Sequence, residues 1–325
     1  MVNWLESSVA LIVLLISFGS LCSQLALLLS IMHARKWARN SGLQLIVALS
    51  VSDSLACVCI GCGALMALLG STDQSVGNLV ALTITGCWFC FCWLLVLMAG
   101  ERVVAIFAPH KLNHLFAPVY VRLFIALVYC MAVALTIPLA IHCCPIYYDF
   151  RHVTHTFNYD EDFVHYIVVL GIVLNVISIG FPLVAYTAIA VRLVKTRNLG
   201  YASVDTSLCW QFFLILLVHT LGIVSFQLLP PILEGHDSRL FYLISLIMPL
   251  DFGINPVVYF YWNETVRRGF HKMTNFDWLT STFVQTRTNE RRESSRNKSN
   301  IQKAATSFAV NVDSKLIISR DAVSL

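Results

Sequence analysis

The stretch DFGINPVVYF, residues 251–260, lies within a long apolar run and yet carries an aspartate, an asparagine and a proline. Pro256 cannot donate a backbone hydrogen bond, so a helix that contains it leaves one carbonyl without its usual partner. In a membrane that carbonyl needs a polar neighbour or water. The stretch therefore predicts a loosened membrane helix that can hold two conformations.

The composition agrees with a membrane location. Of 325 residues, 58% are hydrophobic and only 12% are charged, whereas a soluble domain carries about 25% charged residues. A membrane helix needs about 20 mostly apolar residues. Seven runs of that length are present, at residues 8–32, 43–70, 78–107, 121–142, 164–195, 207–233 and 239–262. The sequence predicts an all-α membrane protein, a bundle of seven transmembrane helices.

Basic residues predict the orientation of the bundle. If the N-terminus is outside, Lys and Arg gather in the cytoplasmic links and helix ends, and only Arg151 and Arg239 lie in the outer links. Such a bias sets membrane topology. The net charge of +4 is then mainly a topology signal and does not indicate nucleic-acid binding. We expect a multi-pass protein of the plasma membrane.

The ends of the chain differ in character. Behind the seventh run, WNETVRRGFHK places Val266 and Phe270 four residues apart, with basic residues on the other faces. That pattern predicts a short amphipathic eighth helix that lies on membrane lipids. We expect residues 1–273 to form one domain and residues 274–325 to form a disordered cytoplasmic tail.

Most of the eleven cysteines lie within the apolar runs, where cysteine acts as a small apolar residue. No metal site is expected, because zinc sites need four converging ligands. Cys143 and Cys144 fall in an outer link, in an oxidising compartment that permits a disulfide. Their partner is not evident from the sequence.

Three motifs occur in order along the runs. Asp53 lies in LSVSDSL of the second run, Glu101-Arg102-Val103 ends the third run with Pro109 beyond it, and Asn255-Pro256-x-x-Tyr259 ends the seventh. Together they closely resemble the signatures of rhodopsin-like (class A) G-protein-coupled receptors. The stretch ERVVAIFAPHKLNHLF and the link CPIYYDFRHVTHTFNYDED are most similar to the nematode serpentine receptor class X group of chemoreceptors.

The resemblance implies that the protein activates heterotrimeric G proteins and is not an enzyme. The residues that it assigns to activation and coupling are Glu101, Arg102, Pro109, Asn255, Pro256 and Tyr259. Arg102 would pair with Glu101 at rest and contact the G protein when the bundle opens. The alternative is an arginine that reaches up to lipid phosphates.

Several positions depart from the family pattern. The usual tryptophan before the sixth-run proline is Leu228 or Leu229, and the usual third-run cysteine is Gly77. The first run reads FGSLCSQL where Gly-Asn is usual. The activation machinery is therefore expected to be partly rebuilt.

Two acids occur inside the runs, and an ionisable residue in a membrane span indicates a functional site. Asp251 lies one helical turn before Asn255 and on the same face, which by resemblance points at Asp53. We expect the two acids to share a proton or to hold a sodium ion, because neighbouring carboxylates repel each other. The alternative is that each only bonds to neighbours such as Ser50 and Asn255.

A ligand pocket is expected in the outer half of the bundle. Ile84 replaces the aspartate that amine receptors use, and Pro249 replaces the lysine that binds retinal in visual pigments. An aromatic, weakly polar lining suits a small neutral or weakly polar molecule. The predicted lining residues are Thr85, Trp88, Phe89, His219, Phe226 and Gln227.

The outer link predicts a strand or hairpin lid, from the alternation in HVTHTF. Its acids, Asp149, Asp160, Glu161 and Asp162, either attract a cationic peptide or are simply solvated. The link also contains three histidines, His142, His152 and His155. Two alternatives stay open for each of them, a place in solvent and a place in a binding site.

The leading interpretation is a chemosensory receptor for a small molecule, and the alternative within the class is a neuropeptide receptor. An intramembrane aspartyl protease that uses Asp53 and Asp251, or a transporter, are the rivals of another class. Arrestin and a basophilic kinase are expected partners, because Ser294 follows Arg-Arg-Glu in the tail.

Overall fold

The computed structural model describes residues 4–33, 37–71, 73–141, 146–157, 162–196, 211, 213–226 and 241–274. Six helices in these ranges are long and apolar enough to cross a membrane, and a shorter apolar helix covers Phe213–Phe226, inside the predicted sixth span. The chain is a multi-pass all-α bundle, as predicted. The six long helices are α1 (Trp4–His33), α2 (Ser41–Leu68), α3 (Gln74–Phe107), α5 (Pro118–Ile141), α6 (Asp162–Thr196) and α8 (Phe241–Trp262).

The remaining described elements are short. They are a 3-10 turn at Trp37–Arg39, helix α4 (Pro109–Leu115), strands β1 (Ile146–Asp149) and β2 (Thr154–Phe157), and helix α9 (Glu264–Thr274). The strands pair antiparallel, with Tyr148 opposite His155. The predicted hairpin is thus confirmed.

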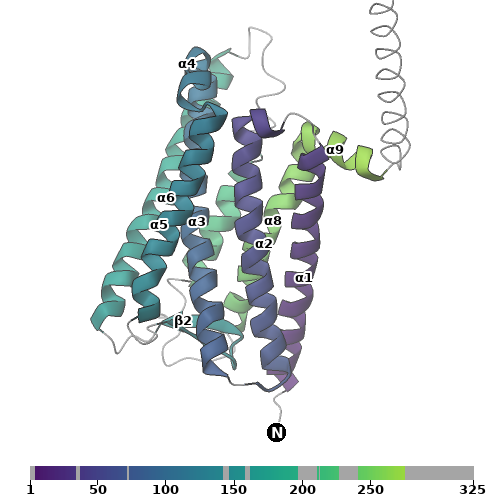
Figure 1. Ribbon diagram of the computed structural model, residues 1–325, viewed down its shortest axis with the longest axis vertical. Coiled ribbons are helices and arrows are strands. Elements are labelled where there is room, and N and C mark those ends of the chain that lie inside the picture. The colour runs from purple at the N-terminus through teal and green to yellow at the C-terminus, as the bar shows by residue number, and fades with distance from the viewer. Residues whose placement is uncertain are drawn as a thin grey trace, which may run out of the picture. The chain divides into compact units, whose positions relative to one another are not determined.

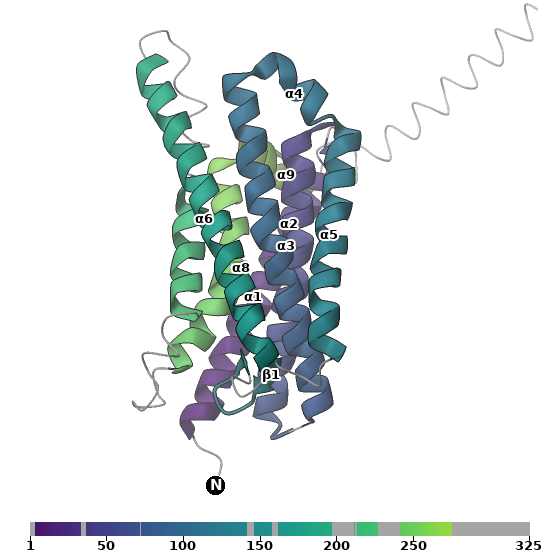
Figure 2. The same ribbon diagram turned by 90° about the vertical axis from the view of Figure 1, so that its left-hand side faces the viewer.

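Helix α3 organises the bundle. It packs against α2, α5, α6 and strand β1, while α1 packs between α2 and α8. Figures 1 and 2 show α5 and α6 on the opposite side of α3 from α1. The hairpin lies at the end of the bundle where α1 begins, and α4 lies at the other end. We call these the hairpin end and the α4 end.

Short polar residues fix where the helices begin. The Oδ1 atom of Asn40 accepts the backbone N–H of Leu43 at 3.0 Å, and Oδ1 of Asp73 accepts that of Ser75 at 3.0 Å. Such caps stabilise a helix by about 1 kcal/mol each. Pro109 begins α4, a position where its missing N–H costs nothing.

Helix α9 confirms the predicted amphipathic eighth helix. Val266 is buried, Arg267 and Arg268 are exposed, and the Phe270 ring contacts Phe260 with centroids 5.1 Å apart. Asn263 caps α9, since its Oδ1 accepts the backbone N–H of Thr265 at 3.1 Å.

The chain divides into two units, residues 1–270 and 271–325. The second is described only over His271–Thr274. The predicted disordered tail, apart from Thr274, lies outside the described residues.

Candidate functional site

A cavity of about 420 Å³ opens among α3, α6, α8, the Phe213–Phe226 helix and the hairpin. Four of the predicted pocket residues line it: Thr85, Trp88, Phe89 and Phe226. His219 does not line it but bonds to Asp251, which does. Gln227 lies outside the described residues. The volume falls within the usual range for small-molecule sites, about 300–1,000 Å³.

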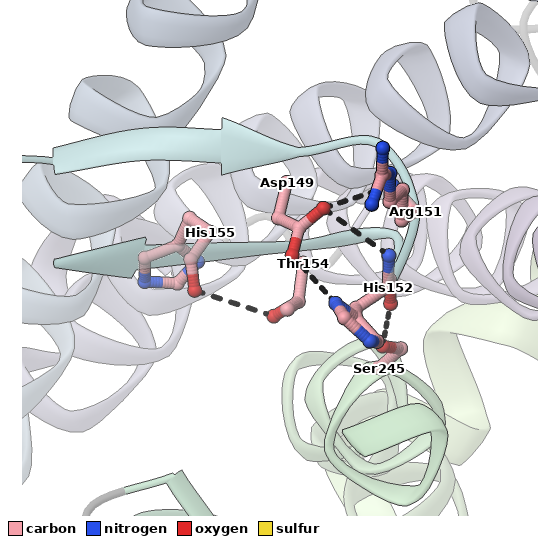
Figure 3. A network of polar contacts seen from close by, with 6 residues as sticks. All are labelled: Asp149, Arg151, His152, Thr154, His155 and Ser245. Atoms are coloured by element: carbon pink, nitrogen blue, oxygen red, sulfur yellow. Dashed lines mark hydrogen bonds and ion pairs between the residues drawn. The ribbon is translucent and has the colours of Figure 1, made fainter. Parts of the chain in front are cut away.

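The hairpin forms one wall of this cavity, and its turn is tightly bonded (Figure 3). Asp149 Oδ1 accepts the backbone N–H of Arg151 at 2.9 Å, and Asp149 Oδ2 lies 2.5 Å from His152 Nδ1. Burial alone would raise the pKa of the Asp149 carboxyl, but the hydrogen bonds and charge of His152 and the backbone N–H groups bring it below its usual range. Asp149 is therefore not a simply solvated acid.

The turn of the hairpin is strained and is tied to α8. Val153 has φ of 54°, a left-handed conformation that β-branched residues rarely adopt. The Ser245 hydroxyl of α8 donates to the His152 carbonyl, and Val153 is buried. These contacts offset the strain, of order 1–3 kcal/mol, and fix the hairpin over the cavity.

Two glycines let the hairpin approach α2 and α3. A Cβ at Gly77 would lie 2.9 Å from the Phe150 ring, and a Cβ at Gly63 would overlap the Tyr148 ring. Gly77 stands where the family pattern has a cysteine that links this helix to the loop. Within the described residues, close packing holds the hairpin at this position. Cys143 and Cys144 lie outside the described residues, so their disulfide stays a prediction.

We predict that Gly63→Ala destabilises the protein by about 1–3 kcal/mol, the usual cost of overpacking. The Tyr148 side chain is only 2% exposed, so the ring has no solvent-filled space into which it can move. The measurement is thermal unfolding of the purified chain. Gly19→Ala is the matched control, because nothing lies within 4 Å of a Cβ there. Equal melting temperatures for the two variants would contradict the close contact.

His155 is the one hairpin histidine whose described surroundings are dry. It is 6% exposed and its ring contacts Phe226 with centroids 4.8 Å apart. Of the two alternatives for His155, solvent or a site, the structure favours a site, because β2 turns its side chain toward the cavity. Burial lowers the pKa of His155 to about 4. His142 lies outside the described residues, and His152 is half-buried.

This shift predicts an acid-sensitive fold. Between pH 6.5 and pH 4, the unfolded chain binds a proton at His155 that the folded chain does not. The contribution of neutral His155 to the free energy of unfolding is therefore complete above pH 6.5, and it is lost as the pH drops through this window. We expect the loss of melting temperature from pH 7.5 to pH 5, values chosen about the ordinary histidine pKa, to be smaller in His155→Gln. His110→Gln, at an exposed position of α4, should keep the full loss. An identical pH profile in all three proteins would refute this role for His155.

Asp251 bonds to the Phe213–Phe226 helix. Its Oδ2 lies 3.1 Å from Nδ1 of His219, and the two side chains are 13% and 1% exposed. The His219 ring also contacts the Phe91 ring of α3 in a tilted arrangement, with centroids 4.2 Å apart. Asp251 itself lies on the cavity wall. The Asp251–His219 pair thus links α8 to the Phe213–Phe226 helix, and His219 in turn contacts α3.

Asp53 lies at the centre of a separate set of bonds. Its Oδ2 accepts the amide of Asn255 at 2.7 Å and the amide of Gln24 at 3.1 Å. Gln24 also donates to the carbonyl of Phe252 at 2.8 Å. All three side chains that meet here are fully buried. Asp53 therefore ties α1 and α8 to α2.

The two acids bond to different partners but are linked through α8. Asp251 faces the cavity, and the next residue, Phe252, has the backbone carbonyl that accepts the Gln24 amide. A change at Asp251 that moves this turn of α8 also moves the bonds around Asp53. The sodium ion or shared proton between the acids stays a prediction.

At the α4 end, Glu101 is nearly buried. Its Oε1 accepts the Ser41 hydroxyl at 2.7 Å, and its Oε2 lies 3.3 Å from Nε of Arg102. Arg102 is 21% exposed. Tyr259 is fully buried and Pro256 is inside α8. The residues assigned to activation thus extend from the polar core to this end, with Pro109 at the start of α4.

Gln24 and the His219–Asp251 pair were not predicted as contacts. The amide of Gln24 was a usable signal, because a buried amide in an apolar helix needs a partner. Ser294 was predicted as a phosphorylation site and lies outside the described residues, as do Asp160 and Glu161. No group of three or more metal-binding side chains occurs among the residues described.

A comparison with protein families matches residues 13–250, well over half of the chain, to the family described as serpentine type 7TM GPCR chemoreceptor Srx. No individually curated protein matches the chain. The match ends one residue before Asp251, so the Asn255-Pro256-x-x-Tyr259 motif lies outside it.

Proposed function

Because the chain belongs to the Srx family of serpentine seven-transmembrane chemoreceptors, we propose that it binds a small molecule at the cell surface and activates a heterotrimeric G protein. In this proposal the protein lies in the plasma membrane with its N-terminus outside. The hairpin end then faces the exterior and the α4 end faces the cytoplasm.

The observation that carries the proposal is the cavity at the hairpin end and its connection to the polar core. Asp251 lines the cavity, and the next residue, Phe252, accepts the Gln24 amide that also bonds to Asp53. A ligand that binds one arrangement of this turn more tightly shifts the population of bundle conformations. Small shifts in a packed bundle can be amplified into a larger rearrangement.

The alternatives receive less support from the described contacts. Hairpin side chains, among them Tyr147, His152 and Thr156, close one side of the cavity, which favours a small molecule over a neuropeptide. An aspartyl protease needs two carboxylates that act on one water, whereas Asp53 and Asp251 bond to different side chains.

The test is a screen of small organic compounds against cells that express the full chain, with a G-protein activation readout. We expect at least one compound to raise the signal above that of cells without the chain. Hydrolysis of a membrane peptide or solute flux by the purified chain, without G-protein activation, would contradict the proposal and support the rivals.

We also predict phosphorylation of Ser294 by a basophilic kinase, followed by arrestin binding. The sequence Arg-Arg-Glu-Ser provides the basic residues, and a phosphate would bring a charge of about −1.5 to −2 to a basic segment. Mass spectrometry of the chain from stimulated cells should detect the phosphopeptide. If Ser294 stays unmodified under an agonist, it is not a phosphorylation site, and the Ser294→Ala receptor should then desensitise as the wild type does.

A further inference from the structure

Buried polar atoms on the cavity wall leave bonding capacity that the protein does not use. Asp251 Oδ1, Asn175 Nδ2 and His155 Nδ1 have no hydrogen-bond partner in the described part of the chain, and all three residues line the cavity. Asn175 is 3% exposed and His155 is 6% exposed. Buried polar groups in native proteins are nearly always paired. These atoms therefore indicate a polar ligand that pairs with them.

The charge on the cavity wall is negative. Asp149 and Asp251 line the cavity, and none of its described lining residues is Lys or Arg. The charge of Asp149 is matched by His152 and by backbone N–H groups of the turn. Among the described residues, the hydrogen-bond partner of Asp251 is His219, which contacts Oδ2.

His219 contacts only one oxygen of the Asp251 carboxyl group, Oδ2. The other oxygen, Oδ1, is buried and has no partner in the described part of the chain. Oδ1 is therefore the oxygen that a ligand cation would pair with.

The rest of the wall is apolar and aromatic. Trp88, Phe89, Ile172, Ile223, Phe226 and Met248 line it. This surface can bury the hydrocarbon body of a small molecule. Asn175 Nδ2 can donate to an acceptor on that body.

We propose that the ligand is a small amphipathic cation, an organic amine whose ammonium group binds Asp251 Oδ1. The proposal rests on the proposed function in taking this cavity as the ligand site. The sequence argued against an amine, because Ile84 stands where amine receptors have an aspartate. The proposal reverses that expectation. Helix α8 supplies an acid from the opposite side of the cavity. A carboxylate ligand would be repelled by Asp251.

The test uses three matched probes on the purified full chain: 2-phenylethylamine, 2-phenylethanol and 3-phenylpropanoate. Each is titrated while thermal unfolding is followed. We expect the amine to stabilise the chain at a concentration at least about tenfold lower than the alcohol, a factor that corresponds to the loss of one charged contact. The carboxylate should not stabilise it.

Two Asp→Asn variants locate the effect. Asp251→Asn should remove the preference for the amine, so that amine and alcohol bind alike. Asp73→Asn is the control and should keep the preference, because Asp73 caps α3 and asparagine caps equally well. If Asp251→Asn does not fold, the ranking of probes on the wild-type chain decides the matter.

The proposal is overturned if the alcohol or the carboxylate binds as well as the amine, if the amine does not stabilise the chain, or if Asp251→Asn keeps the preference. G-protein activation is measured separately. Amine binding without nucleotide exchange on any G protein would refute the proposed function and leave the amine site intact. Exchange that responds to other compounds, without amine preference, would refute the amine site alone.

Discussion

Replacement of Arg102 by alanine is expected to reduce G-protein activation to the level of cells that lack the receptor, while ligand binding persists. Arg102 lies fourteen residues beyond Trp88 along α3, about 21 Å at the helical rise per residue. The substitution therefore cannot alter the cavity by direct contact. Ligand binding and G-protein activation should separate in this variant.

The environment of Arg102 gives the physical reason. Glu101 is held by the Ser41 hydroxyl and lies 3.3 Å from the Arg102 Nε atom, so the guanidinium is held near α2 but is still partly exposed. When the bundle opens, a partly exposed guanidinium can exchange Glu101 for carbonyl or carboxylate groups of a partner. Lysine lacks the planar fork for such contacts, so Arg102→Lys should recover only part of the activity.

The measurement is nucleotide exchange on G proteins in membranes, at equal surface expression of each variant. Arg122→Ala is the matched control. Arg122 is exposed at the start of α5 and bonds to the Pro118 carbonyl of its own helix. Undiminished exchange in Arg102→Ala would make Arg102 a lipid-facing anchor and would contradict its role in coupling.

Replacement of Asp53 by asparagine is expected to change the basal activity and its dependence on sodium or pH, with little effect on folding. The variant keeps the shape of the side chain but replaces one of its two oxygens with an N–H donor, next to an oxygen that accepts two amide bonds. Leaving a buried hydrogen-bonding group unpaired costs about 1–3 kcal/mol. A change of that size shifts the ratio of two bundle conformations by about tenfold or more.

Asp251→Asn should act in the same direction, because Asp251 and Phe252 share the turn of α8 that Gln24 contacts. The double variant should then be less than additive. The measurement is basal nucleotide exchange as a function of sodium and of pH for the two single variants and the double variant. Unrelated profiles that combine additively would mean that the two acids act independently, and the sodium or shared-proton hypothesis should be abandoned.

The sequence allowed the helices to be predicted well, because membrane spans are read from length and polarity alone. The hairpin was also predictable, since alternation in HVTHTF has the period of a strand. Helix α4 was not predicted, although Pro109 at its first position is a usable signal. It is too short for a hydrophobic pattern to reveal.

The contacts of the site were harder to predict. The resemblance predicted that Asp251 would face Asp53, because Asn255 lies one turn away. The resemblance did not predict that Asp251 also lies on the cavity wall against His219, 32 residues away along the chain. No periodicity encodes a contact between side chains on two separate helices. Gln24 of α1 reaches both Asp53 and the Phe252 carbonyl, which only the packing of α1 against α2 and α8 could show.

The central claim is that a molecule in the cavity at the hairpin end controls a G protein at the α4 end. Its most direct test is nucleotide exchange in membranes that contain the full chain, a panel of Gα subunits and a compound obtained from the screen. We predict that the compound accelerates exchange with the wild-type chain and binds without accelerating exchange in Arg102→Ala. A compound that stabilises the purified wild-type chain and yet accelerates exchange on no Gα subunit would contradict the account.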